Sequence, residues 1–313
     1  MPGAQLLLRA ATLLTLLLPS TQAQSTRCQW ASLRSATDAV LESLSSGTLS
    51  ASVPSSNFTY TQNLHAMDIS APASILSTPL SAAYTHSIID QDACAAFVKL
   101  VINSTSSSPN STGTSPQENE NKPILLGMHL HYTYTPSTGA ALNTLNLVAA
   151  GPQDWQMGVA PTTTNITNTL LTYLQHEAWP ALSRAKQDSR AILQSIAESY
   201  LNFLAGNSTS TTSTSNETVA SVPWGRPCSR LEGAMYTAIA DSERCDKGIV
   251  TFQEGPGRGL GVTERSAFVV DESVGAVSVL ARDGRLHDAA SVFEMRVVEG
   301  GLRYVHQFAS LAG

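Results

Sequence analysis

Histidines at alternate positions are the residues best suited to chemistry in this 313-residue chain. Tyr304 and His306 are two positions apart in a strand-like run near the C-terminus. His129 and His131 have the same spacing in another such run. Side chains two positions apart on a strand project from the same face. An imidazole changes charge near neutral pH, so His306 could protonate or deprotonate a substrate oxygen, or be a strand histidine held by a neighbour. His129 and His131 could bind a metal, but no third ligand can be named, so we predict no metal site.

Three more polar residues complete the predicted catalytic set. If the chain is extended around residue 230, Arg230 and Glu232 point to one face. The guanidinium could bind an acidic oxygen that Glu232 positions, or the two could form a structural ion pair. Tyr236 could donate a hydrogen bond into a cavity or serve as a core tyrosine. The predicted catalytic residues are therefore His306, Arg230, Tyr236 and Glu232.

The first half of the chain has the pattern of a helix, strands, a second helix and a closing hairpin. Apolar side chains fall on one face of the first helix, and Gly47 can end it in a left-handed turn. Asp90 or Asp92 would cap the second helix. The predicted ranges are 30–44 (helix), 58–61 and 84–89 (strands), 93–101 (helix), and 124–133 with 142–149 (hairpin).

The second half repeats this order. Asp188 would cap a strongly amphipathic helix, and Gly300 and Gly301 supply the turn of a final hairpin. The predicted ranges are 189–204 (helix), 249–253, 266–270 and 276–281 (strands), and 292–298 with 302–308 (hairpin). A helix followed by a twisted antiparallel sheet is typical of an α+β cone with a cavity beneath the helix. We predict two tandem cones, with one cone preceded by a divergent region as the alternative.

The N-terminal segment, residues 1–23, is predicted to be a signal peptide. Arg9 precedes a short apolar run, and small residues at Thr21 and Ala23 suit cleavage before Gln24. The two cones would then occupy residues 24–160 and 181–313, with polar loops at 103–121 and 207–221. We predict a secreted or vesicle-lumen protein that carries N-glycans. The acceptor sites are Asn57, Asn103, Asn110, Asn165, Asn207 and Asn216.

Four cysteines form an even set that suits an oxidising compartment. Three pairings are possible. We predict Cys28 with Cys94 and Cys228 with Cys245, because each bridge then stays within one half of the chain. A metal site is the alternative, but no Cys-x-x-Cys spacing occurs.

Composition excludes several classes of function. The chain has a formal net charge of -6 and no basic run, which argues against nucleic acid as a partner. No later stretch is long enough to span a membrane. No Gly-x-Ser-x-Gly motif occurs, and the glycine-rich residues 255–261 contain Pro256 and lead into no helix. We predict no cofactor.

Several strings resemble a domain-of-unknown-function family common in secreted fungal proteins. They are residues 222–233 (VPWGRPCSRLEG), 268–272 (FVVDE), 275–279 (GAVSV) and 299–306 (EGGLRYVH), with Asp90, Cys94, Phe97, Gly127 and Asp154-Trp155 in the first half. The resemblance covers most of the mature chain. It implies α+β structure built of two tandem cystatin-like cones, similar to nuclear transport factor 2 and ketosteroid isomerase.

The resemblance also implies a function. Most members of the family have no assigned activity, but some similar proteins are hetero-Diels–Alderases of tropolonic sesquiterpene pathways, which join a tropolone o-quinone methide to a humulene-type alkene. We therefore expect such an enzyme acting on small apolar substrates, with a non-catalytic secreted glycoprotein that binds an apolar ligand or host partner as the alternative. One departure is Phe293, which stands where the family often has a histidine.

Overall fold

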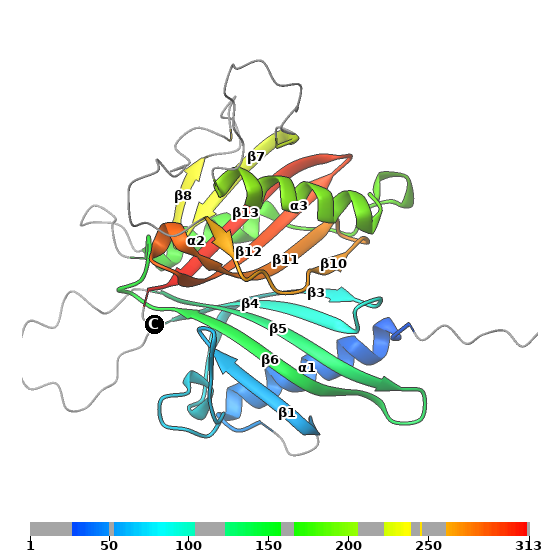
Figure 1. Ribbon diagram of the computed structural model, residues 1–313, viewed down its shortest axis with the longest axis vertical. Coiled ribbons are helices and arrows are strands. Elements are labelled where there is room, and N and C mark those ends of the chain that lie inside the picture. The colour runs from blue at the N-terminus through cyan, green and yellow to red at the C-terminus, as the bar shows by residue number, and fades with distance from the viewer. Residues whose placement is uncertain are drawn as a thin grey trace, which may run out of the picture.

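The chain folds into two mostly antiparallel β-sheets with few helices, an α+β arrangement seen in a computed structural model (Figure 1). The structure describes residues 27–49, 53–103, 123–157, 166–205, 222–238, 245 and 261–311. The predicted signal peptide, the strand at 249–253, nearly all of the two polar loops and four of the six acceptor asparagines lie outside these residues. The other two, Asn57 and Asn103, are exposed on strands.

The first sheet is covered on one face by a helix that ends as predicted at Gly47, where φ is 72°. Its strands lie in the order β2-β1-β6-β5-β4-β3, with β1 parallel to β6 and the other neighbours antiparallel. The elements are α1 (Trp30–Ser46), β1 (Pro54–Gln62), β2 (His65–Ala66), η1 (Ile75–Ser77), β3 (Ala82–Asp90), β4 (Ala95–Asn103), β5 (Pro123–Thr135) and β6 (Gly139–Ala150).

The second sheet has the same strand order as the first. Read from its far edge it runs β8-β7-β13-β12-β11-β10, with β7 parallel to β13, and the short β9 pairs with β11. The elements are α3 (Arg190–Leu204), β7 (Trp224–Glu232), β8 (Met235–Ala238), β9 (Val262–Thr263), β10 (Val269–Asp271), β11 (Ala276–Asp283), η3 (Gly284–Leu286), β12 (Ala289–Val298) and β13 (Gly301–Ser310). Strands β7 and β8 were not among the predicted ranges.

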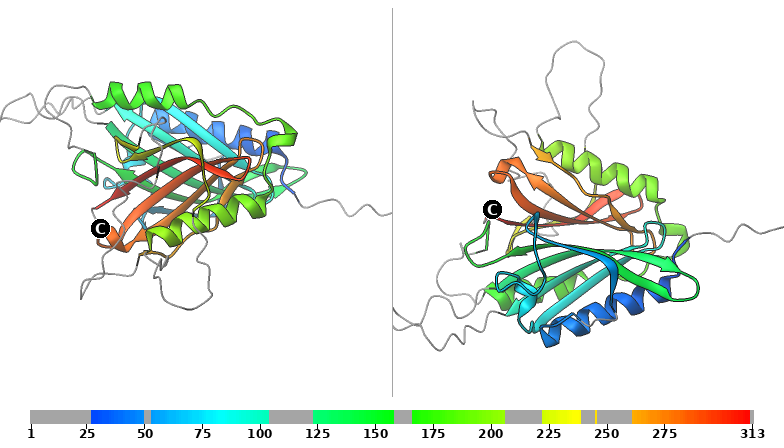
Figure 2. Two further views of the ribbon diagram at one scale, coloured as in Figure 1. Left: turned by 90° about the horizontal axis from the view of Figure 1, so that it is seen from above. Right: turned by 60° about the horizontal axis from the view of Figure 1, so that its bottom comes forward.

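The two sheets stack face to face, and α1 and α3 cover their outer faces (Figure 2). Each half therefore has its own core beneath its helix, and a third apolar cluster lies between the sheets. A further helix, α2 (Ile166–Glu177), adds Leu170 and Leu174 to this middle cluster. Sequence analysis missed α2, which precedes a short η2 turn (Arg184–Lys186).

The predicted helix at 93–101 is wrong, because these residues form strand β4. All but the last residue of β4 are buried, since one face packs under α1 and the other against the second sheet. A strand buried on both faces is a continuous apolar run, which periodicity alone cannot distinguish from a buried helix. Asp90 instead accepts hydrogen bonds from the backbone N–H groups of Asp92 and Ala93 in the turn before β4.

The predicted cap of α3 also differs. Ser189 rather than Asp188 occupies the N-cap position, and Asp188 accepts a hydrogen bond from the backbone N–H of Gly300 at 2.9 Å. The side chain thus ties the start of α3 to the turn of the last hairpin.

Both predicted disulfides are confirmed. Cys28 bonds Cys94 and so joins the start of α1 to the turn before β4, while Cys228 of β7 bonds Cys245. No helix in the described part of the chain is long and apolar enough to cross a membrane.

Gly127 of β5 marks a point of close approach between the sheets. A Cβ atom there would lie 2.6 Å from Val292 Cγ2 and 2.8 Å from Phe308 Cζ, both on the second sheet. Since tightly packed side chains can give way only by leaving their preferred rotamers, we expect Gly127→Ala to lower the free energy of unfolding by about 1–3 kcal/mol in urea denaturation. Gly151→Ala is the matched control, because the nearest atom to its new Cβ would lie 3.7 Å away. Equal unfolding midpoints for the two variants would contradict this account.

Candidate functional site

The four predicted catalytic residues lie on two different faces of the second sheet. In the parallel pairing of β7 with β13, His306 lies beside Leu231 and Val305 lies beside Arg230. Leu231 belongs to the cluster between the sheets, whereas Val305 belongs to the core beneath α3. His306 therefore faces the first sheet, and Arg230 faces α3.

Arg230 and Glu232 form an ion pair on the α3 side. The guanidinium Nη2 lies 3.0 Å from the Glu232 carboxylate, and Nη1 donates to the carbonyl oxygen of Cys245 at 2.7 Å. Phe293, which we expect to stand where the family often has a histidine, is fully buried in the same core. The predicted role of Arg230 in binding an acidic oxygen stays a prediction.

His306 and Tyr236 converge on one carboxylate, that of Glu177 at the end of α2. His306 Nε2 lies 2.6 Å from Glu177 Oε2, while the hydroxyls of Tyr236 and Ser229 each donate to Oε1 at 2.9 Å. The side chain of Glu177 is 8% exposed against 1% for His306, and Tyr236 is half-buried, so this end of the cluster lies nearer to solvent. The arrangement joins a buried imidazole to a more accessible carboxylate and phenol.

A second carboxylate lies on the inner side of His306. Glu294 of β12 is fully buried and pairs with Lys99, which comes from β4 of the first sheet. The second carboxylate oxygen of Glu294 lies 2.7 Å from Nδ1 of His86, which is on β3. We call Glu177, His306, Glu294, Lys99 and His86 the inter-sheet cluster, because its charges come from both sheets and from α2.

The inter-sheet cluster favours a proton on His306. Burial opposes a charge on this ring, but the Glu177 carboxylate outweighs burial and raises the pKa of His306 above 6.5, against the opposing charge of Lys99. Burial also opposes the charge on Glu177, yet His306 lowers the pKa of Glu177 to about 2. Likewise, Lys99 and then His86 overcome burial and hold the pKa of Glu294 well below its usual value. The carboxylates of Glu177 and Glu294 are thus each paired with a positive charge, from His306 and from Lys99.

Nδ1 of His306 has a partner for each of its protonation states. Glu294 Oε2 lies 3.1 Å away and can accept Nδ1–H from the protonated ring. Lys99 Nζ lies 2.5 Å away and can donate to Nδ1 of the neutral ring. The ring can therefore lose and regain a proton without leaving a buried nitrogen unpaired.

The indole of Trp179 covers this cluster. It stacks on His306 with ring centroids 5.3 Å apart and meets His86 edge-on at 4.9 Å. Trp179 belongs to the connection between α2 and α3, so a linking segment forms one wall of the site.

His129 and His131 share a face, as predicted, with ring centroids 6.3 Å apart. His129 is fully buried between the sheets, where burial and then His131 lower the pKa of His129 to about 3. Its Nε2 lies 3.0 Å from the Ser278 hydroxyl. Within the described residues no three His, Cys, Asp or Glu side chains are grouped as metal ligands would be.

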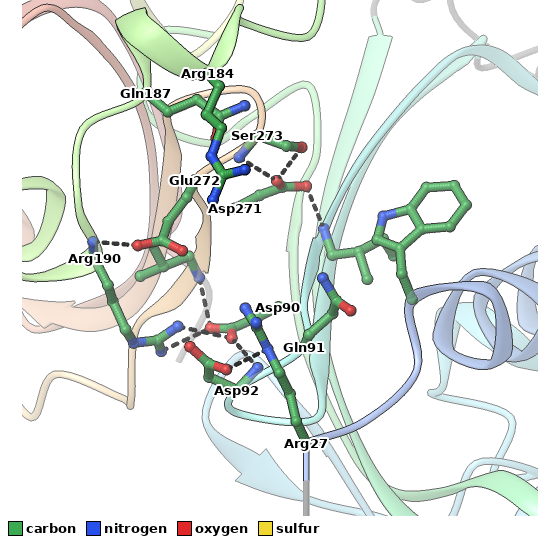
Figure 3. A pocket seen from close by; sticks show the side chains of 13 residues that line it. Arg27, Asp90, Gln91, Asp92, Arg184, Gln187, Arg190, Asp271, Glu272 and Ser273 are labelled. Carbon is green, nitrogen blue, oxygen red and sulfur yellow. Dashed lines mark hydrogen bonds and ion pairs between the residues drawn. The ribbon is translucent and has the colours of Figure 1, made fainter. Parts of the chain in front are cut away.

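A separate polar pocket of about 430 Å³ lies at the seam between the two halves (Figure 3). Asp90, which is 1% exposed, accepts two hydrogen bonds from the Arg190 guanidinium at 2.7 and 2.8 Å and one from the backbone N–H of Val270. Arg27 pairs with Asp92, and Asp271 accepts the backbone N–H of Ile89. These charges bind one another across the seam and tie β3 to β10 and α3.

One family model matches part of the chain. Residues 186–309 match a domain of unknown function, DUF8021. The match begins just before α3 and ends in β13, so it covers the second sheet and its helix. It supports the resemblance to such a family over this part of the chain. No curated protein matches the chain.

Sequence analysis missed Glu177, Glu294 and Lys99. Glu294 and Lys99 are charged residues inside strands that are otherwise buried, which is the one signal that could have found them. Glu177 lies at the end of the helix that was not predicted, and no sequence spacing connects it to His306.

The charge on Glu177 should control the proton affinity of His306. We expect Glu177→Gln to lower the pKa of His306, measured from the pH dependence of its imidazole NMR signals, because the attraction of a carboxylate 2.6 Å away is lost. Glu198→Gln is the control, since Glu198 lies on α3 and pairs with Arg265 away from the cluster. An unchanged or higher pKa for His306 in Glu177→Gln would show that other groups hold the proton.

The same shifts predict how stability depends on pH. The raised pKa of His306 contributes stability that is fully present below pH 6.5 and is lost as pH rises through its folded pKa. The lowered pKa of Glu177 contributes stability that is present above pH 4.5 and is lost as pH falls towards 2.

Proposed function

We propose that this protein is a general acid/base enzyme that acts on a small, largely apolar, hydroxylated substrate beside Glu177. The observation that carries the proposal is the convergence of His306 Nε2 and the Tyr236 hydroxyl on the carboxylate of Glu177, whose side chain is 8% exposed. A protonated imidazole behind a more accessible carboxylate provides a buried proton store with an outlet. Tyr236 supplies a hydrogen-bond donor, because burial and then Glu177 raise its pKa and keep it protonated.

The proposed reaction starts with loss of water from the substrate. A proton passes from His306 to Glu177 along their 2.6 Å contact and leaves with the departing hydroxyl as water. The ring hydroxyl of the substrate then returns a proton to His306 by the same route, so the enzyme regains its starting state. Tyr236 would donate a hydrogen bond to the substrate oxygen on which charge develops.

The concrete reaction in this proposal is that of a hetero-Diels–Alderase. A hydroxymethyl tropolone would lose water to form an o-quinone methide, which would add to a humulene-type alkene in terpenoid–polyketide biosynthesis. Holding the two apolar partners together removes much of the entropic barrier to a bimolecular cycloaddition. The family match to residues 186–309 and the earlier resemblance support this choice.

Two further proposals concern the cellular compartment of the protein and the fold family of each half. Two disulfides fit an oxidising environment, and we propose that the chain is exported after removal of residues 1–23 and glycosylated. We further propose that each sheet with its helix is a cone similar to nuclear transport factor 2. The equal strand order of the two sheets supports this.

Incubation of the glycosylated protein with a hydroxymethyl tropolone and a humulene-type alcohol tests the reaction. We expect one enantiomer of the adduct, formed faster than with boiled protein and followed by chiral chromatography and mass spectrometry. His306→Gln and Glu177→Gln should each slow dehydration by about 100-fold or more, as expected for loss of a general acid. His176→Gln, an exposed histidine also on α2, should keep the full rate. Racemic products at the uncatalysed rate would refute the reaction, and full activity of His306→Gln would refute the site.

The second candidate function is non-catalytic binding of a small ligand beneath α3. The Tyr200 hydroxyl is fully buried and has no hydrogen-bond partner among the described residues. Burial raises the pKa of Tyr200, while the nearby charge of Arg230 acts in the opposite direction. A ligand oxygen that accepts from this hydroxyl would satisfy a group that the protein leaves unpaired.

An unpaired buried hydroxyl contributes no hydrogen bond to the ligand-free fold. We therefore expect Tyr200→Phe to leave the free energy of unfolding unchanged or to raise it, measured by urea denaturation. Tyr132→Phe is the matched control, because the Tyr132 hydroxyl lies 2.9 Å from Thr37 Oγ1 in the core beneath α1. Its loss should cost about 1 kcal/mol. An equal loss of stability in both variants would mean that Tyr200 is already satisfied.

A further inference from the structure

The indole of Trp179 packs against three other rings at the edge of the inter-sheet cluster. We call the rings of His306, Tyr304 and His86 the aromatic cage, or simply the cage. The indole stacks on His306 and on Tyr304, with centroids 5.3 and 6.1 Å away and interplanar angles of 30° and 22°. His86 meets it edge-on at 4.9 Å. The three rings come from β13 and β3, so both sheets contribute to the cage.

Two cations also lie over the indole. Lys99 Nζ is 5.7 Å and Arg296 Cζ is 5.8 Å from its centroid, and Lys99 lies at 5.8 Å over the ring of Tyr84 as well. A cation over a ring face is attracted by the electron-rich π system. The cage therefore suits a planar, electron-rich ring better than a saturated group of the same size.

The segment that carries Trp179 is held in a strained conformation. Ala178 has φ of 25°, in the region that favours glycine. Arg296 donates to the carbonyl oxygens on both sides of Trp179, those of Ala178 and Pro180, at 3.0 Å each. Arg296 is 5% exposed, and its Nε has no hydrogen-bond partner in the described part of the chain. Its guanidinium thus retains one buried donor beside the cage.

We propose that this cage is a binding site for a planar, electron-rich aromatic ligand and that Trp179 is the side chain such a ligand displaces. The ligand would stack on His306 and Tyr304 beneath Lys99 and Arg296, and a polar substituent on it could accept from Arg296 Nε. Release of the strained backbone at Ala178 would offset part of the cost of moving Trp179. The site shares His306 with the proposed acid/base enzyme, and it rests on that proposal only if the ligand is also the substrate.

Binding of 2-naphthol to the full glycosylated chain tests this inference. Trp179→Ala leaves the cage open, so we expect it to bind 2-naphthol at least about tenfold more tightly than the wild type by titration calorimetry, since the wild type must first move Trp179. Trp30→Ala is the control, because Trp30 is 48% exposed and lies outside the cage. It should bind 2-naphthol as the wild type does.

A saturated probe separates a π-binding cage from a simple apolar hole. Decahydro-2-naphthol has the same carbon skeleton and hydroxyl as 2-naphthol without the aromatic rings, and we expect Trp179→Ala to bind it at least about tenfold more weakly. Equal affinities for the two probes would overturn the proposed ligand class. Equal affinity of wild type and Trp179→Ala for 2-naphthol would overturn the site. If Trp179→Ala does not fold, Trp179→Leu keeps an apolar side chain without the aromatic face, and the same two outcomes decide.

Failure of this inference is distinguishable from failure of the proposed enzyme. Binding to Trp179→Ala with no cycloaddition by the wild type would keep the aromatic site and reject the reaction. A catalytic wild type whose Trp179→Ala variant binds neither probe would keep the reaction and reject the cage.

Discussion

The contact between the two sheets is the constraint on which the rest of the structure depends. Each sheet covers one face with a helix and must bury the other, and the second sheet supplies that cover. The sheets approach so closely at Gly127 that no side chain fits there. Lys99 and Glu294 lie inside this contact, where an unpaired charge would cost several kcal/mol. They must therefore pair with each other, and this need gathers the ionisable groups into one cluster.

The two sheets share a strand order but bring different ionisable groups to their contact. The first sheet brings Lys99 and His86 to the contact, and the second brings Glu294 and His306. The buried charge of Lys99 in the first half is thus paired with Glu294 of the second half. The seam at Asp90 follows the same rule, because its carboxylate binds the guanidinium of Arg190 on α3. The halves are coupled by charge as well as by apolar packing.

The connection between the halves supplies part of the inter-sheet cluster and its cover. Glu177 ends α2, and Trp179 follows two residues later, so a segment that belongs to neither sheet closes the cluster. Both residues lie outside the part that matches the family of unknown function. Trp179 is half-buried, so this segment lies between the inter-sheet cluster and solvent.

Local patterns in the sequence determined much of the fold. The helices at 30–44 and 189–204, the two hairpins and both disulfides follow from periodicity, turn residues and the position of cysteines within each half. Strand β4 escaped this reasoning, because burial on both faces removes the alternation that marks a strand. Which residues meet in the candidate site was decided by tertiary structure. His306 was identifiable by its chemistry, but Lys99 and Glu294 are 195 positions apart, and only the stacking of the sheets decides which buried charges meet and which face of the sheet Arg230 occupies.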